Sequence, residues 1–311
     1  MRLLRLRPPK WVYLLFLIGA ASLTIRALRD AEFAHSALLY VSVPFAIAIL
    51  LHHFVGYGDR QGAMGRYALH MRNATIVMLG SSAILFEGFL CVLMFMPIYY
   101  IVVTIVYVSI TPVEQKGRGG PTFRAFVVPV VAIVLSLEGV TPATSFSRSN
   151  HVTVSAIVNA DIDTLKANMA MPIGLEQRRH WFLSLFPQAE RVEAGSLTPG
   201  DVHTLHFVYR RWLVTNVHRG QMRLRIESVG ANHVRTRIIE NTSYLANYLT
   251  IRGTKVRFEK LANGKTRVSL TVGYDRRLDP AWYFGPLQRL VVRLSAKYLI
   301  SSVIAREAAD G

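Results

Sequence analysis

Histidine and cysteine are the side chains with which this chain could most readily bind a metal ion or attack a substrate. His203 and His206 are three residues apart in a segment with a strand pattern, so they point to opposite faces and cannot chelate one ion together. His52 and His53 are adjacent at the end of an apolar run, where we expect an interfacial pair rather than a pair of ligands. Cys91 is the only cysteine, which excludes an intrachain disulfide and a CxxC site. The sequence therefore predicts no metal site and no cofactor.

Sequence motifs of the common enzyme classes are missing. The sequence contains no GxSxG, P-loop or HExxH motif, the signatures of many hydrolases, nucleotide-binding enzymes and metalloproteases. Four carboxylates of the C-terminal half lie in polar or turn segments, where we expect them to be solvated: Asp275, Asp279, Glu227 and Glu240. The sequence leaves catalysis undecided and favours a protein that binds over one that reacts.

Two glutamates interrupt the apolar N-terminal half, and each is followed by glycine. Glu87 and Gly88 lie in the run ILFEGFLCVLMFMPIYY, and Glu138 precedes Gly139. A charged side chain at the bilayer centre costs about 2.5–3.5 kcal/mol on insertion scales, whereas glycine ends a helix and lets the chain turn. We therefore expect both carboxylates at helix ends, at one edge of a membrane. Three interpretations are open for this pair. The glutamates are solvated caps of helix ends, or they form an acidic patch that docks a basic domain or binds a cation, or they are a catalytic pair.

Apolar runs in the N-terminal half are long enough for four or five membrane-spanning helices, each of which needs about 20 residues. The run at 76–110 is too long for one span and suffices for two that turn near Glu87. The first run also has the shape of a signal peptide, but no small-residue cleavage site follows it. The expected spans lie within 11–25, 36–51, 76–110 and 125–137.

Basic residues set the expected orientation of these spans, because loops rich in Lys and Arg stay in the cytoplasm. Such residues gather at the N-terminus, at 60–72 and at 116–124, and five spans place all three on the cytoplasmic side. The remainder of the chain then lies outside, in the periplasm of a bacterium, with Glu87 and Glu138 at the outer edge. Four spans, with the segment around Glu87 re-entrant or interfacial, would place it inside. We favour five.

The chain is both strongly basic and apolar. Its 311 residues are 51% hydrophobic, with a formal net charge of +17 and a mean hydropathy of +0.30. A basic domain attached to a membrane is expected to meet anionic head groups. Nucleic acid is the competing partner, but we do not expect it, because the arginines follow strands instead of a basic helix (Arg223, Arg225, Arg235 and Arg237). The sequence identifies no protein partner.

From residue 144 onward the pattern changes from apolar helices to alternating strands. Asp161 is the expected cap of a short helix that ends near 170, Asn263-Gly264 is a hairpin signal, and Asp279-Pro280 begins a long helix. Short turns between the strands predict an antiparallel sheet. The expected strands are 151–158, 201–211, 221–229, 233–240, 248–261 and 266–277. We predict an α+β chain with a transmembrane helical region at 1–143 and a sheet-and-helix domain at 144–311.

The long terminal helix is expected to clasp the curved sheet and to leave an apolar ligand cavity, because a straight helix cannot fill a curved surface. Its apolar stripe at helical spacing consists of Tyr283, Leu287, Leu290, Val291, Leu294 and Tyr298. Trp181 and Phe182 form either a flap over the cavity mouth or an ordinary helix on the core. The residues expected to line the cavity are Trp181, Phe182, Tyr209, Trp212, Tyr244, Tyr248, Trp282, Tyr283, Leu287, Val291 and Leu294.

The order of these elements resembles the START-like (SRPBCC, polyketide cyclase/dehydrase-like) helix-grip superfamily over residues 148–305. The ending TRVSLTVGYDRRLDPAWYFGPLQRLVVRLSAKYLI is similar to the last strand and helix of those proteins. The resemblance implies a helix-grip fold and a lipid or other hydrophobic small molecule as ligand. It also implies an alternative function, because some members are cyclases or hydrolases, here with a polyketide-like or isoprenoid substrate.

The membrane half resembles that of uncharacterised bacterial membrane-anchored members of the superfamily. The shared pattern is E-G-x-x-C-x-x-M-x-x-P, formed here by Glu87, Gly88, Cys91, Met94 and Pro97. This resemblance implies a multi-pass protein of the bacterial inner membrane. A membrane-anchored binding protein of this kind would serve lipid transfer or sensing at the membrane surface.

Overall fold

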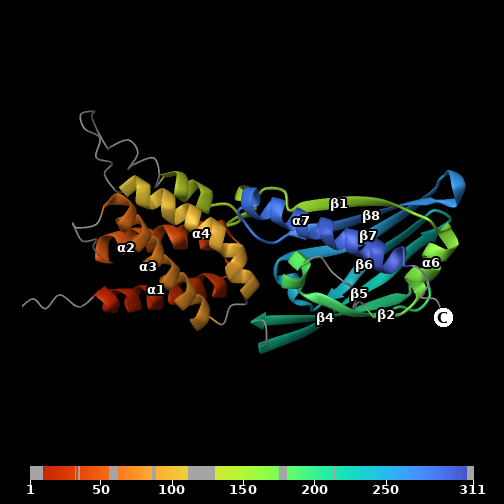
Figure 1. The fold of residues 1–311 in the computed structure, drawn as a ribbon, viewed down its shortest axis with the longest axis horizontal. Helices are drawn as coiled ribbons and strands as arrows, with labels where there is room; N and C mark the ends of the chain where they lie inside the picture. The colour runs from red at the N-terminus through yellow and green to blue at the C-terminus, as the bar shows by residue number, and fades with distance from the viewer. Residues whose placement is uncertain are drawn as a thin grey trace, which may run out of the picture. The chain divides into compact units, whose positions relative to one another are not determined.

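The computed structural model describes residues 10–31, 33, 36–55, 62–85, 89–110, 130–174, 181–212 and 215–306. The chain folds as two compact units that divide between Phe146 and Ser147. The first unit is helical and the second is an α+β domain (Figure 1). Each unit has a hydrophobic core of its own.

The N-terminal unit is a set of apolar helices. They are α1 (Lys10–Asp30), the π-helical turn η2 (Leu38–Ser42) with α2 (Val43–Val55), α3 (Ala63–Ile84) and α4 (Phe89–Ile110). Within the part of the chain that the structure describes, three helices are long and apolar enough to cross a membrane, namely Lys10–Asp30, Leu38–Val55 and Leu90–Ile110. Helix α3 has the length of a span but is more polar, and the expected run at 125–137 is described only from residue 130 onward, where 130–136 are helical. A total of four or five spans therefore stays a prediction.

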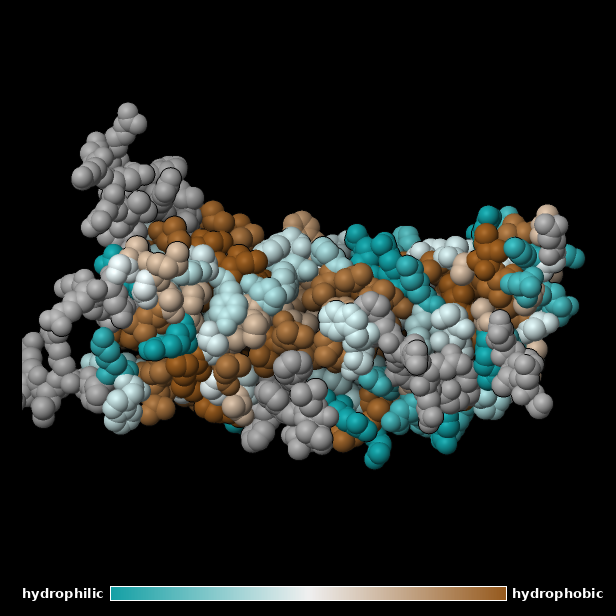
Figure 2. Space-filling view, in the orientation of Figure 1, coloured by the Kyte–Doolittle hydropathy of each residue, from teal (hydrophilic) through white to brown (hydrophobic). Residues whose placement is uncertain are grey.

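Polar side chains of the helical unit point inward. His70 and Asn73 on α3 are buried, and the Tyr99 hydroxyl on α4 donates to the Ala74 carbonyl at 2.8 Å. The Thr75 and Tyr100 hydroxyls share a hydrogen bond of 2.7 Å between the same helices. Large apolar side chains instead cover much of the outer surface (Figure 2). Helices in a lipid environment are expected to bury their polar groups and to expose their apolar groups.

The motif residues of this unit are only partly described. Cys91 is partly buried on α4, and Pro97 lies inside the same helix with an exposed side chain. Glu138 is 7% exposed, so it is not the solvated cap that one interpretation expected. Its backbone carbonyl accepts from the Ala37 amide at 2.9 Å. Glu87 and Gly88 lie outside the described residues, so an acidic patch of the two glutamates stays a prediction.

The C-terminal unit confirms the predicted α+β class, with an antiparallel sheet and a long terminal helix. All neighbouring strands are antiparallel, in the order β1-β8-β7-β6-β5-β4-β3-β2. The strands are β1 (Ser149–Val158), β2 (Ile173–Gly174), β3 (Gln188–Glu193), β4 (Val202–Trp212), β5 (Thr215–Gly230), β6 (His233–Asn241), β7 (Leu249–Lys260) and β8 (Thr266–Arg276). The helical elements are α6 (Ile162–Ala170), η4 (Trp181–Leu185), η5 (Tyr244–Asn247), η6 (Ala262–Gly264), α7 (Ala281–Leu299) and η7 (Ile300–Ile304).

Helix α7 lies across the curled sheet (Figure 1) and shares its core. Alternate residues of β8, among them Val268, Leu270 and Val272, point to the side of the helix and pack with Val292 and Ala296. This period of two is the pattern of a sheet with one buried face. The helix begins at Ala281 with Pro280 as its N-cap residue, which confirms the predicted start.

The buried face of α7 differs from the predicted stripe. Leu290, a predicted stripe residue, is 46% exposed, whereas Phe284 and Gln288 are buried. Gln288 faces inward because its side-chain amide donates to the Tyr248 carbonyl at 2.9 Å. Counting apolar positions could not reveal a glutamine that is buried by a specific hydrogen bond.

Asp279 is fully buried, which corrects the expectation that it is solvated. It accepts hydrogen bonds from the guanidinium groups of Arg148, at 2.6 Å, and Arg276. Arg276 is itself buried and also donates to the Leu278 carbonyl at 2.6 Å. This cluster ties the start of β1 and the end of β8 to the turn before α7.

Asp161 caps α6 as predicted, and its carboxylate accepts from the Thr164 amide at 2.7 Å. That hydrogen bond holds the pKa of Asp161 below its usual value. A carboxyl whose pKa is lowered by folding stabilises the fold above its unfolded pKa, and this contribution disappears as the pH falls through the folded pKa. We expect Asp161→Asn to keep the cap but to remove this part of the acid sensitivity. Urea midpoints measured at neutral and acidic pH test it; equal acid sensitivity in both proteins would contradict it.

Candidate ligand-binding cavity

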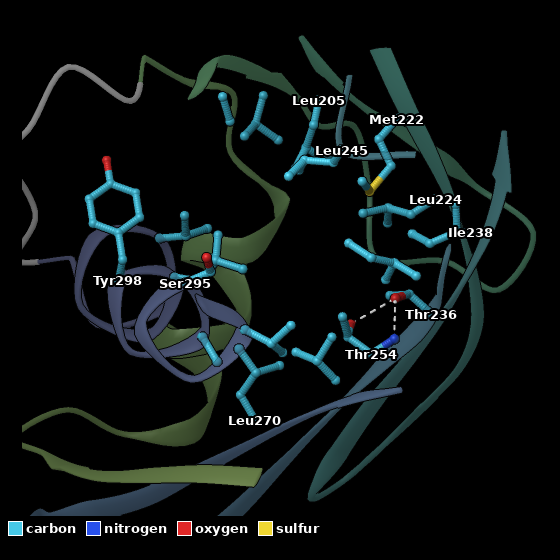
Figure 3. A pocket seen from close by; sticks show the side chains of 18 of the residues that line it. Leu205, Met222, Leu224, Thr236, Ile238, Leu245, Thr254, Leu270, Ser295 and Tyr298 are labelled. Carbon is cyan, nitrogen blue, oxygen red and sulfur yellow. Dashed lines mark hydrogen bonds between the residues drawn. The ribbon is translucent and has the colours of Figure 1, made fainter. Parts of the chain in front are cut away.

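A cavity of about 250 Å³ lies between the inner face of the sheet and α7. Its wall is mostly aliphatic, and among the described residues no Asp, Glu, Lys or Arg lines it. Figure 3 shows residues of the sheet and of α7 facing each other across this space. The residues that line it include Leu205, Met222, Leu224 and Ile238 from the sheet, Val291, Ser295 and Leu299 from α7, Met169 from α6, and Leu183 and Phe186 in and next to η4.

Strand alternation builds the sheet side of the cavity. On β5, Met222, Leu224 and Ile226 line the space, and on β6 Thr236 and Ile238 do. Successive residues of a strand point to opposite faces, so the residues between them point away from the cavity. That outer face is basic, and its exposed side chains include Arg225, Arg235, Arg237 and Arg257.

A β-bulge changes the phase of this alternation on β7. Leu249 and Ile251 line the cavity before it, and Thr254 and Val256 do so after it, because the pairing with β8 shifts register between Ile251 and Gly253. Bulges commonly redirect side chains near functional sites. Without this one, the strand would turn Thr254 to the outer face.

Glycine is required at the bulge. A Cβ atom at Gly253 would lie 2.2 Å from the carbonyl oxygen of Thr236 on the neighbouring strand. The close approach of β6 and β7 at this point therefore depends on the missing side chain.

Few polar side chains reach the cavity. Thr236 on β6 and Thr254 on β7 are joined by a hydrogen bond of 2.8 Å between their hydroxyls. His203 is 5% exposed, and its Nε2 atom is hydrogen-bonded to the Ser196 carbonyl at 2.9 Å. Ser295 and Tyr298 come from α7 (Figure 3), and Gln188 comes from β3. The cavity can thus hold an apolar molecule and offers hydrogen bonds at a few defined points.

The predicted cavity residues fall in three places. Val291 lines the cavity. Tyr209, Tyr244 and Tyr248 form an aromatic cluster, in which Tyr209 stacks on Tyr244 at 4.6 Å between ring centroids. Tyr283, Leu287 and Leu294 are partly buried and Trp282 is exposed on α7, all four outside the lining. Trp212 ends β4, and its side chain is not among those described. Which of these residues contact a ligand stays a prediction.

Trp181 and Phe182 lie beside the cavity wall. Trp181 is 71% exposed and contacts Phe182, which contacts Phe186 at 5.4 Å between ring centroids. Phe186 lines the cavity. This aromatic series leads from the surface to the interior, and both interpretations, a flap over the cavity mouth and an ordinary helix on the core, stay predictions.

Sequence reasoning missed most of the aliphatic lining. The alternate residues of β4, β5 and β6 form it, and their period of two was visible in the sequence. The predicted cavity residues were mainly aromatic, and these aliphatic positions were not among them. The alternation separates the two faces of a strand, but it does not give the curvature of the sheet or the position of α7, which decide which face lines a cavity.

The predicted separation of the two strand histidines is confirmed. His203 lines the cavity, whereas the Nε2 atom of His206 lies 3.2 Å from a carboxylate oxygen of Glu193 outside it. The hydrogen bond from His206 lowers the pKa of Glu193.

Among the described residues, no three His, Cys, Asp or Glu side chains come together in a way that could hold a metal ion.

Comparisons with known proteins give low similarity. No family model matches the sequence, and no curated protein matches it. The similar solved structures include Ara h 8.0201 (13% identity, 51% of this chain and 99% of that chain, TM-score 0.33). They also include an aromatase/cyclase from Streptomyces (16%, 52% and 98%, TM-score 0.33) and a START superfamily protein from Mycobacterium smegmatis (13%, 49% and 96%, TM-score 0.32). Similarity this low carries no argument about ligand or reaction, so the function has to be inferred from the cavity itself.

Proposed function

We propose that the C-terminal unit binds a lipid or another mainly hydrocarbon molecule in its cavity, and that the N-terminal helices hold it at a membrane. The cavity carries this proposal. Protein interiors are normally close-packed, and aliphatic walls around an unfilled space forfeit dispersion contacts. An apolar ligand restores those contacts and removes its own surface from water, at about 25 cal/mol per Å².

The membrane part of the proposal is supported by the helical unit. Three of its helices are long and apolar enough to span a bilayer, and its polar side chains point inward. We place the protein in the bacterial inner membrane as a multi-pass protein with five spans and a periplasmic C-terminal unit, on the basis of its basic loops. The arginines on the outer face of the sheet suit anionic head groups, at about 1 kcal/mol for each basic residue near the surface. The role would be lipid transfer or sensing.

One observation favours an enzyme as the second candidate. His203 is a titratable side chain that lines the cavity, as a cyclase or hydrolase acting on a polyketide-like or isoprenoid substrate would need. In that case His203→Asn would abolish turnover of a bound substrate and leave its binding nearly unchanged. A binding protein predicts no chemical change of the bound molecule in either protein.

The test uses the full chain, purified in detergent and reconstituted in lipid nanodiscs. We expect organic extraction and mass spectrometry to recover an apolar compound enriched over the bulk lipid. We also expect the neutral fluorophore N-phenyl-1-naphthylamine to bind saturably at one site per chain. Failure of both measurements, with the chain still folded, would overturn the proposed function.

A further inference from the structure

Two threonine hydroxyls face the cavity from neighbouring strands. Thr236 on β6 and Thr254 on β7 are direct partners in the sheet, and their Oγ1 atoms are 2.8 Å apart. The Thr254 amide donates to Oγ1 of Thr236 at 3.3 Å. Figure 3 shows both hydroxyls on the sheet side of the space, with aliphatic side chains such as Ile238 and Leu224 nearby.

The location of this pair is unusual within its own sheet. Cross-strand hydroxyl pairs also join Thr153 to Thr271 and Ser155 to Ser269, each at 2.8 Å, but these are exposed to solvent. The pair at Thr236 is instead part of the wall of an apolar cavity. It is there because the bulge at Gly253 turns Thr254 inward, so a specific backbone feature places the second hydroxyl.

A count of hydrogen-bonding groups shows what the pair offers. Each hydroxyl has one proton to donate and two lone pairs to accept with. The contact between the two Oγ1 atoms uses one of the two protons, and the amide bond uses a lone pair of Thr236. The hydrogen bonds of the structure therefore leave one hydroxyl proton of the pair for a further acceptor, in surroundings where an unused donor is costly.

The surrounding charges limit the kind of acceptor. No described Asp, Glu, Lys or Arg lines the cavity, so a carboxylate or phosphate at this point would be buried without a permanently charged partner. A neutral oxygen has no such cost.

We propose that Thr236 and Thr254 form a subsite for an uncharged oxygen of the ligand, so that the ligand is a hydrocarbon body bearing an alcohol, ketone or quinone oxygen. The proposal rests on the function proposed above, because it requires a ligand in the cavity. It adds the chemical class of that ligand and the point at which it is held.

A pair of probes of matched shape tests the subsite. 2-Acetylnaphthalene carries a ketone oxygen where 2-isopropylnaphthalene carries a methyl group. Both are titrated into the full chain in nanodiscs by displacement of N-phenyl-1-naphthylamine. Because both probes also enter the lipid, the quantity compared between variants is the ratio of the two apparent dissociation constants. We expect Thr254→Val to reduce the preference for the ketone by about twofold to tenfold, the loss of one hydrogen bond.

Three further variants control the experiment. Thr254→Ser restores the hydroxyl and should restore the preference. Thr236→Val tests the second hydroxyl in the same way. Thr153→Val removes a hydroxyl of an exposed pair and should leave the ratio unchanged. If both probes bind and neither valine variant in the cavity changes the ratio, the subsite is overturned while the proposed function stands. If the fluorophore binds but neither probe displaces it, the subsite is overturned while the proposed function stands. If the fluorophore does not bind the folded wild-type chain and no apolar compound is extracted from it, the proposed function is overturned together with the subsite.

Discussion

Replacement of Asp279 by alanine is expected to destabilise the C-terminal unit by about 3–5 kcal/mol, the usual result of removing one partner of a buried ion pair. Asp279 and Arg276 are both almost completely buried, and Arg148 donates to the same carboxylate. Without that carboxylate, the guanidinium of Arg276 would remain in the interior with its charge uncompensated. The free energy of unfolding can be measured for the full chain in nanodiscs by urea titration with proteolysis of the unfolded fraction.

Asp275→Ala is the matched control for this prediction. Asp275 lies on the neighbouring strand β8, its side chain is 38% exposed, and its oxygen is 3.6 Å from Arg252. Exposed pairs of this kind contribute about 0–1 kcal/mol, so the control should lose little. Similar losses in the two variants would show that the cluster at Asp279 does not stabilise the fold in the way its burial indicates.

A second large effect is expected at Ile238, whose side chain lines the cavity from β6. The indole of Ile238→Trp would occupy space that the ligand needs, and binding of the neutral fluorophore should weaken by about tenfold or more, equivalent to about 1.4 kcal/mol or more. Stability should be kept or slightly increased, because filling a cavity commonly stabilises a protein. Fluorophore titration and urea titration on the same preparation separate a blocked site from an unfolded one.

The neighbouring residue offers a control of the same type. Ile239 follows Ile238 on the strand, points to the opposite face and is 38% exposed. Ile239→Trp adds the same indole outside the cavity and should bind the fluorophore as the wild type does. Equal weakening in both variants would mean that the fluorophore binds elsewhere, and would remove the support for the cavity as the ligand site.

Both predictions concern residues whose importance only the structure revealed. In the sequence, Asp279 stands before a proline at the start of a helix, a context in which aspartate is usually solvated. Its partner Arg148 is 131 residues away along the chain, and no local pattern can indicate that the two meet. The same holds for Gln288, which has the polarity of a surface residue and becomes buried through the Tyr248 carbonyl.

The sequence by itself determined the order and type of most elements in the C-terminal unit, but it did not predict the strands β2 and β3. The alternating segments became strands of one antiparallel sheet, Asp161 capped its helix, and the terminal helix began next to Pro280. These features depend on neighbours within a few residues, which is the range over which propensity, periodicity and capping act. The apolar runs likewise predicted the three helices that are able to cross a membrane.

Only the tertiary structure decided which side chains surround the cavity. The bulge at Gly253 reverses the inward and outward faces in the middle of β7, and the neighbouring strand β6 approaches Gly253 too closely to admit a Cβ atom. The rotation of α7 about its axis decides that Val291 faces inward and Leu290 outward. Both depend on packing between segments that are distant in the sequence, and this packing fixes the shape of the cavity and the position of its two threonine hydroxyls.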